Sequence, residues 1–276
     1  MDHRSLRREL RRAPGRVGAG VAALGAMLLL AAACASDPPV EDEWAQLAPA
    51  DELYEQGVAE LESGRKVWLV DTTDYAAAID HFQDIIDNYP YSEYAVLAEL
   101  RIADAYFEQA LYEEALSYYQ DFADLHPDHE QVPYTIYRAA LSHVNRSRDA
   151  LRDQTATTQA ITQIDRLLRD HPYSSEASEA DRLARRMRAR LGENVMRIGD
   201  FYLEREEWQS AANRYRSVLN EYPGLGLDAE ALYKLAKCYG ELDRADEAMR
   251  MFQVILENYE GSYVAAAAEE LIPAAN

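Results

Sequence analysis

A helical pattern that ends in a proline turn recurs five times along the chain, and it restricts the fold more than any other feature. Each copy has an alanine, a large residue four positions later, a largely apolar pair seven and eight positions later, and then Tyr or His. Proline follows in four copies and glutamate in the fifth. These spacings fall on one face of an α-helix, and proline ends such a helix. The five predicted helices occupy residues 77–90, 114–127, 159–172, 210–223 and 247–260.

A second helical pattern precedes these segments. In three copies a small residue stands twelve positions before the alanine and a tyrosine stands nine before it. The pairs are Ala103 with Tyr106, Gly199 with Tyr202, and Ala236 with Tyr239. Two antiparallel helices with this pattern are typical of the tetratricopeptide repeat (TPR). Because one pair cannot bury its apolar face alone, stacked pairs form a continuous core. The sequence therefore predicts an all-α TPR solenoid of five helix pairs.

Three segments depart from the regular repeat. The first and third copies carry inserts at residues 65–72 and 146–155, which we expect to project as loops from one face of the solenoid. Residues 174–206 keep helical spacing without a proline, which predicts one long helix. This helix joins an N-terminal half, residues 51–173, to a C-terminal half, residues 174–276. Near the end of the chain, residues 262–271 are predicted to form a short capping helix.

The N-terminus resembles a bacterial lipoprotein signal. Six arginines precede an apolar run over residues 17–33, which ends in LLLAAAC. The resemblance implies that residues 1–33 are removed, that Cys34 carries the lipid, and that residues 34–50 form an acidic, proline-rich tether. Plain secretion and an uncleaved anchor are the alternatives. Ala35 rather than Asp follows the cysteine, which indicates the periplasmic face of the outer membrane under the enterobacterial sorting rule. Acylation would leave Cys238 as a lone, buried thiol.

No constellation of residues indicates catalysis. His126 and His129 could approach a metal only across a proline turn, without a carboxylate or cysteine at ligand spacing. The chain has no nucleophile elbow and no glycine-rich phosphate loop. We therefore expect a protein that is not an enzyme and has no cofactor or metal, apart from the lipid on Cys34. The net charge of −21 also argues against nucleic acid as a partner.

The first helix of each TPR pair lines a concave groove, and its outward positions predict the groove's character. In the first three repeats these positions are apolar or aromatic, which suits an extended peptide with large side chains. The alternative is that part of the set packs against neighbouring helices. The candidate groove residues are Tyr54, Leu97, Leu100, Phe107, Tyr134 and Tyr137.

Arginine is concentrated in the middle of an otherwise acidic chain. Residues 160–220 contain 11 arginines and 10 acidic residues, a balance of +1, whereas the whole chain has a net charge of −21. Five of these arginines lie within nine positions: Arg182, Arg185, Arg186, Arg188 and Arg190. Arginine forms forked hydrogen bonds to carboxylates, so the cluster suits an acidic protein surface. The alternative is that acids on adjacent helices neutralise it.

These motifs, taken in order, resemble the BamD family of outer-membrane β-barrel assembly lipoproteins. The resemblance covers about residues 50–260 and rests on YPYSEYA, LHPDHEQVPYTIYRAAL, RDQT, HPYSSEA before the long helix, and EEWQSAANRYRSVLNEYP. It implies a periplasmic scaffold whose C-terminal repeats bind the periplasmic domains of a BamA-like barrel component. The N-terminal repeats would engage unfolded outer-membrane proteins, and other accessory lipoproteins are further candidate partners. A family arginine that contacts the barrel component corresponds to Arg214, and we add Arg185, Arg186 and Arg190 as candidates for that contact.

Two other functions compete with this interpretation. Periplasmic TPR proteins similar to the CpoB/YbgF group of the Tol–Pal system share the YPxSxYA turn. They carry an N-terminal coiled coil and lack a lipidated cysteine, whereas this chain has no heptad run after Cys34. A hydrolase that uses the HPDH loop is the third hypothesis, and it lacks a nucleophile.

Overall fold

A computed structural model describes residues 48–64, 66–67, 70–146 and 154–271. The predictions made for the signal peptide, Cys34 and residues 35–47 of the tether lie outside this set. The central residues of both inserts lie outside it as well.

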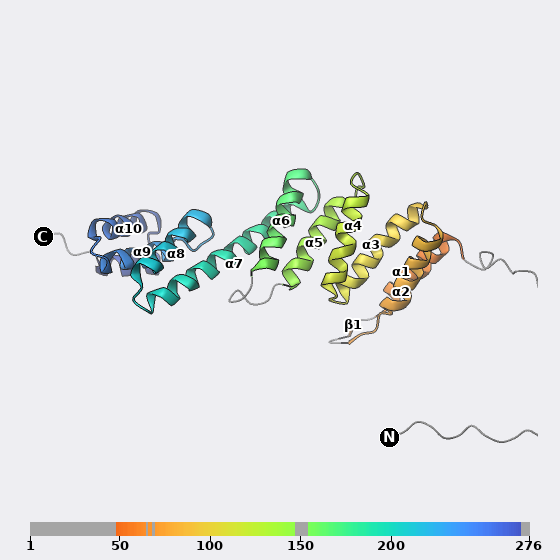
Figure 1. Ribbon diagram of the computed structural model, residues 1–276, viewed down its shortest axis with the longest axis horizontal. Coiled ribbons are helices and arrows are strands. Elements are labelled where there is room, and N and C mark those ends of the chain that lie inside the picture. Colours follow the sequence, from red (N-terminus) through yellow and green to blue (C-terminus); the bar gives the residue numbers. More distant parts are fainter. Residues whose placement is uncertain (1–47, 65, 68–69, 147–153, 272–276) are drawn as a thin grey trace, which may run out of the picture. The chain divides into compact units, whose positions relative to one another are not determined.

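Eleven helices follow one another in the described part of the chain (Figure 1). They are α1 (Ala50–Ser63), α2 (Tyr75–Asn88), α3 (Glu93–Glu108), α4 (Tyr112–Leu125), α5 (Val132–Arg146), α6 (Thr155–Asp170), α7 (Ala177–Leu203), α8 (Trp208–Glu221), α9 (Asp228–Glu241), α10 (Ala245–Asn258) and α11 (Tyr263–Leu271). Each helix packs against the next in the chain. The predicted solenoid of five helix pairs, the long helix and the capping helix are thus confirmed.

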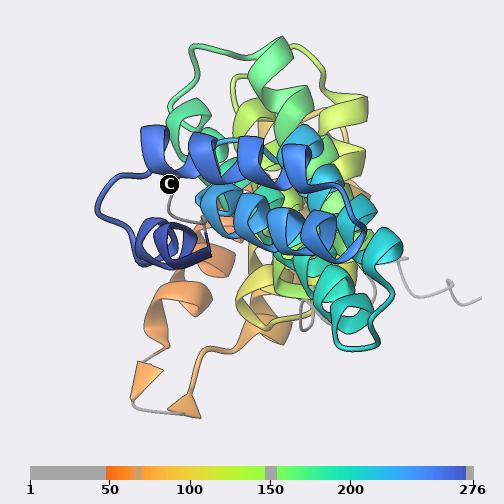
Figure 2. The same cartoon turned by 90° about the vertical axis from the view of Figure 1, so that its left-hand side faces the viewer.

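A small β-hairpin stands between α1 and α2, where the sequence predicted only a loop. Strand β1 (Lys66–Val67) pairs antiparallel with β2 (Val70–Asp71), so that Lys66 lies opposite Asp71 and Val67 opposite Val70. Figure 2 shows the two strands at the bottom of the view, where they project away from the helices. The β-branched valines favour strand geometry, and a pattern built on helical spacing does not detect so short a hairpin.

The recurrent Tyr or His ends the second helix of each pair with one backbone geometry. These five residues have φ between −133° and −123° and ψ between 36° and 57°, and each donates its backbone N–H to the carbonyl four residues earlier. Proline disfavours helical geometry in the residue before it, which explains four of the turns. Tyr259 precedes Glu260 and has the same geometry, so the packing of the next helix also imposes this turn.

In two of the pairs, a glycine on the first helix meets the large residue on the second helix. A Cβ added at Gly199 would lie 2.6 Å from Cε1 of Tyr215, and one added at Gly57 would lie 2.7 Å from the ring of Phe82. The small residue on the first helix therefore lets the large residue on the second helix approach its backbone. This contact brings the two helices of a pair together.

The long helix α7 belongs to two hydrophobic clusters. It contributes Leu183 and Met187 to a cluster that begins at Leu100, and Met196 to a second cluster that extends to Ala268. Within the described residues, no helix is both long and apolar enough to cross a membrane. Cys238 is fully buried in the second cluster, as predicted, and burial raises the pKa of its thiol to about 11. It is therefore an uncharged core residue at neutral pH.

Candidate protein-binding surfaces

A polar network centred on Asp104 joins three consecutive helices of the N-terminal repeats. Asp104, on α3, accepts hydrogen bonds at Oδ1 from the hydroxyl of Tyr119 on α4, at 2.6 Å, and from that of Tyr134 on α5, at 2.8 Å. The guanidinium of Arg138, also on α5, lies 3.6 Å from the same oxygen. Burial raises the pKa of both tyrosines far above the usual range, and the charge of Asp104 raises it further. Both hydroxyls therefore remain protonated donors.

Arg138 connects this network to the predicted groove. Its Nε donates to the hydroxyl of Tyr119 at 2.9 Å, and its guanidinium lies 3.7 Å from the centre of the Phe107 ring. Only 16% of its side chain is exposed. A cation stacked on an aromatic face and held by an aspartate is a rigid feature. The surface around Phe107 and Tyr134 therefore contains a cation held by an aspartate, in addition to the aromatic side chains that the sequence predicted.

A second network in the C-terminal repeats has the same construction. Asp200, on α7, accepts hydrogen bonds from the hydroxyl of Tyr215 at 2.7 Å and from Nζ of Lys234 at 2.7 Å. Lys234 also lies 2.7 Å from a carboxylate oxygen of Glu230. Sequence reasoning missed both networks. The signal was present, because an aspartate is followed by a tyrosine after 15 residues and by a cation after 34 residues in each half.

The remaining groove candidates of the first repeats differ in burial, because some lie at the surface and one lies in the hydrophobic core. The hydroxyl of Tyr54 accepts a hydrogen bond from Nε of Arg101 at 3.0 Å, and its ring packs near Phe82 and Tyr94. Leu97 is half-buried. Leu100 is only 7% exposed and belongs to the hydrophobic core, so its assignment to the groove surface was wrong. Its helical position faces the packed side because α3 is covered by neighbours on both sides.

The structure brings together residues that the sequence placed in two different surfaces. Tyr137 of the predicted groove lines a cavity of about 490 Å³ with Glu179, Arg182, Arg185 and Arg186 from the first half of α7. The predicted client surface and part of the predicted partner surface therefore meet here.

The two other partner candidates lie elsewhere. Arg214 is exposed on α8 and does not line this cavity. Arg190 is half-buried within α7, so it offers less of its side chain to a partner than Arg185 or Arg186. The four arginines proposed for the same contact thus do not form a single patch.

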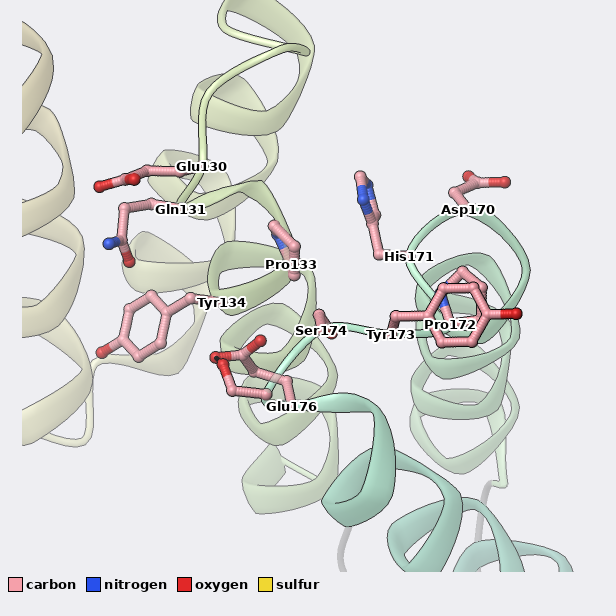
Figure 3. Close-up of a pocket in the computed structure, with 11 residues that line it drawn as sticks. Glu130, Gln131, Pro133, Tyr134, Asp170, His171, Pro172, Tyr173, Ser174 and Glu176 are labelled. Atoms are coloured by element: carbon pink, nitrogen blue, oxygen red, sulfur yellow. Dashed lines mark hydrogen bonds between the residues drawn. The ribbon is translucent and has the colours of Figure 1, made fainter.

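A further cavity of about 470 Å³ lies beside the start of α5 (Figure 3). Its walls come from the turn before α5 and from the turn between α6 and α7. The side chain of Tyr173 is 99% exposed at its edge. Among the described residues, no group of three His, Cys, Asp or Glu side chains is arranged to hold a metal ion. The residues that line the cavity are Glu130, Gln131, Pro133, Tyr134, Asp170, His171, Pro172, Tyr173, Ser174, Ser175 and Glu176.

The model of the YfiO family, described as an outer membrane lipoprotein, matches residues 47–255. The chain belongs to this family. The match confirms the resemblance that the turn motifs and the long helix indicated.

Curated relatives of this YfiO-family chain align with most of its length. An outer membrane protein assembly factor BamD from Rickettsia prowazekii (strain Madrid E) is 30% identical over 216 residues, which cover 78% of this chain and 82% of that protein. A BamD from Vibrio cholerae is 27% identical over 235 residues, which cover 82% of this chain and 92% of that protein. Among solved structures, a TPR2AB-domain:pHSP90 complex of yeast Sti1 aligns with 80% of this chain and 83% of that one, at 16% identity and a TM-score of 0.42. Similarity at that level carries no argument about function.

Proposed function

We propose that this protein is a scaffold of the outer-membrane β-barrel assembly machinery and helps outer-membrane proteins to insert and fold. The observation that carries the proposal is the match of the YfiO family over residues 47–255, which covers most of the TPR body. Relatives that align with this chain over most of their own length are named as outer membrane protein assembly factors. The repeat architecture supports a binding role, because stacked helix pairs present extended surfaces.

The proposed scaffold is held on the periplasmic face of the outer membrane by a lipid on Cys34. The LLLAAAC pattern and the family's description as a lipoprotein support this anchor. The proposal assigns no catalytic role to the chain. Its residues would act by binding other proteins rather than by changing covalent bonds.

Two surfaces are proposed to bind different partners. The N-terminal repeats would receive segments of unfolded outer-membrane proteins along the side that carries Tyr54, Phe107, Tyr134 and Tyr137. Exposed Arg214 on α8 would contact the periplasmic domains of a BamA-like barrel component. An exposed arginine suits this role because its guanidinium can form forked bonds with a carboxylate of the partner.

The proposal is tested by purifying the tagged, full-length protein from detergent-solubilised membranes and identifying the co-purified proteins by mass spectrometry. We expect a large β-barrel protein with repeated periplasmic domains in near-equal amount. Recovery of Tol–Pal components instead would reject the assembly role in favour of a CpoB/YbgF-like function. A tagged lipoprotein without TPRs, purified in parallel, controls for proteins that adhere to any outer-membrane lipoprotein.

A further inference from the structure

The cavity between α5 and the first half of α7 has an unusual composition for so acidic a chain. Three of the five residues that line it are arginines, Arg182, Arg185 and Arg186, and the others are Tyr137 and Glu179. The chain as a whole has a net charge of −21. A local excess of cations in a concave site attracts negatively charged groups.

The cavity already holds one carboxylate of its own, which shows how such a group is bound there. Glu179 lies 3.0 Å from Nη2 of Arg182 and accepts a hydrogen bond from the hydroxyl of Tyr137 at 3.4 Å. Burial raises the pKa of Tyr137, and the charge of Glu179 raises it further, so the hydroxyl stays protonated. An arginine and a tyrosine hydroxyl thus cooperate in holding a carboxylate.

The other two arginines keep donors that none of the described residues uses. Arg185 donates from Nε to Asp181 at 3.1 Å, and 71% of its side chain is exposed. Within the described part of the chain, no hydrogen bond or ion pair engages the exposed Arg186. A guanidinium has five N–H donors in a planar fork. The two side chains together can therefore bind more than one additional carboxylate.

A nearby arginine shows what an internally neutralised side chain looks like on this helix. Arg188 turns towards α6, where its Nη2 lies 2.6 Å from Asp165. The internal neutralisation that was the alternative interpretation of the arginine cluster therefore holds for Arg188. Arg188 ties two helices together, whereas Arg185 and Arg186 face the cavity and the solvent.

We propose that this cavity binds an acidic segment of a partner protein, one that carries two or more Asp or Glu side chains close together. The spare donors of Arg185 and Arg186 exceed what the single carboxylate at a chain terminus would use, which favours acidic side chains as the ligand. The inference rests on the proposed scaffold role and adds the chemistry of one docking site to it. Tyr137 and Arg182 would keep Glu179 in place at the edge of the site.

The test measures peptide binding to the full-length protein in detergent by fluorescence anisotropy. The probe is a fluorescein-labelled, C-terminally amidated peptide of glutamates alternating with glycines, at about 50 mM salt, where charges are weakly screened. The pocket variant combines Arg185→Gln with Arg186→Gln. Its control combines Arg169→Gln with Arg250→Gln, exposed arginines on α6 and α10 that remove the same charge. We expect about tenfold weaker binding in the pocket variant and less than about a twofold change in the control.

Several outcomes would overturn the proposal. Equal weakening in both variants would show attraction by overall charge alone, and equal binding of a glutamine-for-glutamate peptide would show that carboxylates are not needed. Tighter binding of a glutamine peptide with a free C-terminus would identify a chain terminus as the ligand. Circular dichroism melting checks that both variants fold. The paired change Arg185→Lys and Arg186→Lys keeps the charge but not the fork, so undiminished binding would contradict forked recognition.

The result can be separated from that of the proposed function. If the peptide fails to bind while the barrel component still co-purifies with the protein, only the cavity assignment is wrong. If the barrel component is absent from the purified complex, the assembly role is rejected whatever the peptide does.

Discussion

Gly199 shows at the scale of one residue how the repeat enforces its geometry. The ring of Tyr215 occupies the space where a side chain at position 199 would begin. The hydroxyl of the same tyrosine is bonded to Asp200, the next residue of α7. The ring is therefore held at both ends, and it cannot move aside without breaking this partly buried hydrogen bond.

Replacing Gly199 by leucine should destabilise the protein by roughly 1–3 kcal/mol, because the added side chain overpacks the contact with Tyr215. Urea unfolding followed by circular dichroism measures the change. The matched control is Gly240→Ala on α9, where an added Cβ meets no atom within 4 Å. Alanine has a higher helix propensity than glycine, so the control variant should be more stable than the wild type by about 0.5–1 kcal/mol. Unchanged stability in Gly199→Leu would show that the repeat register is wrong.

We expect His143 to make the stability of the fold depend on pH. This residue of α5 is only 4% exposed, and its Nδ1 has no hydrogen-bond partner within the described structure. Burial lowers the pKa of His143 below the usual value of 6.5, and the charge of Arg146 lowers it further. The unfolded state therefore takes up a proton at higher pH than the folded state does.

The stability that neutral His143 contributes should be fully present above about pH 6.5. As the pH falls below that value, the free energy of unfolding should decrease by up to about 1.4 kcal/mol per pH unit. The free energy of unfolding measured at about pH 7.5 and pH 5.5 tests this. The variant His143→Gln should lose less stability between the two values than the wild type. An identical loss in both proteins would rule out His143 as the source, since all other titrating groups are shared.

At the scale of elements, the two aspartate-centred networks give the helix stack its polar connections. Asp104 links α3 to α4 and α5, and Asp200 links α7 to α8 and α9. Each network joins a helix pair to the first helix of the next pair. Apolar contacts between helices tolerate small shifts, whereas hydrogen bonds require a defined distance and direction. The networks therefore fix how successive pairs are placed.

The change Asp104→Ala should destabilise the protein by about 2–3 kcal/mol, because Arg138 and two tyrosine hydroxyls lose their common acceptor. Urea unfolding measures this effect. Asp121→Ala on the exposed face of α4 is the control and should change stability by less than about 0.5 kcal/mol. In the background Tyr134→Phe the cost of Asp104→Ala should be smaller, since one partner is already absent. Equal costs in both backgrounds would mean that these two residues are not coupled.

At the scale of the whole molecule, an acidic chain presents arginines at separate places, and both proposed contacts use them. Arg185 and Arg186 lie on α7, and Arg214 lies on α8. Because they do not form one patch, the two proposed contacts would not compete for the same cations. Electrostatic complementarity of this kind governs which partners associate and how fast.

Arg214→Glu should weaken co-purification of the barrel component by about tenfold while the melting temperature stays unchanged, because the charge is reversed on an exposed side chain. Quantitative mass spectrometry of the purified complex gives the ratio of the two proteins. The control Arg169→Glu reverses a charge on α6, where 69% of the side chain is exposed. Undiminished recovery of the barrel component with Arg214→Glu would refute the assignment of this arginine.

Cys34→Ser should release the protein from the membrane fraction into the soluble periplasmic fraction, because the lipid would lose its attachment point. Immunoblots of fractionated cells measure the distribution. Cys238→Ser is the control, since that buried thiol is distant in sequence from the signal and should leave the protein with the membranes. Membrane association that persists in Cys34→Ser even when Arg214→Glu removes the proposed contact with the barrel component would indicate an uncleaved anchor instead.

The sequence by itself determined the helix pairs and their ends. Helical periodicity marks each helix and proline marks most of the turns, so both follow from residues that are near one another in the chain. The polar contacts inside a pair, such as that between Asp200 and Tyr215, were not predicted. Tertiary structure alone decided which side chains from different repeats meet. It buried Leu100, gathered Tyr134 and Arg138 around Asp104, and set Tyr137 beside the arginines of α7. These contacts depend on how adjacent helix pairs pack and cross, and the periodicity of a single helix carries no information about that.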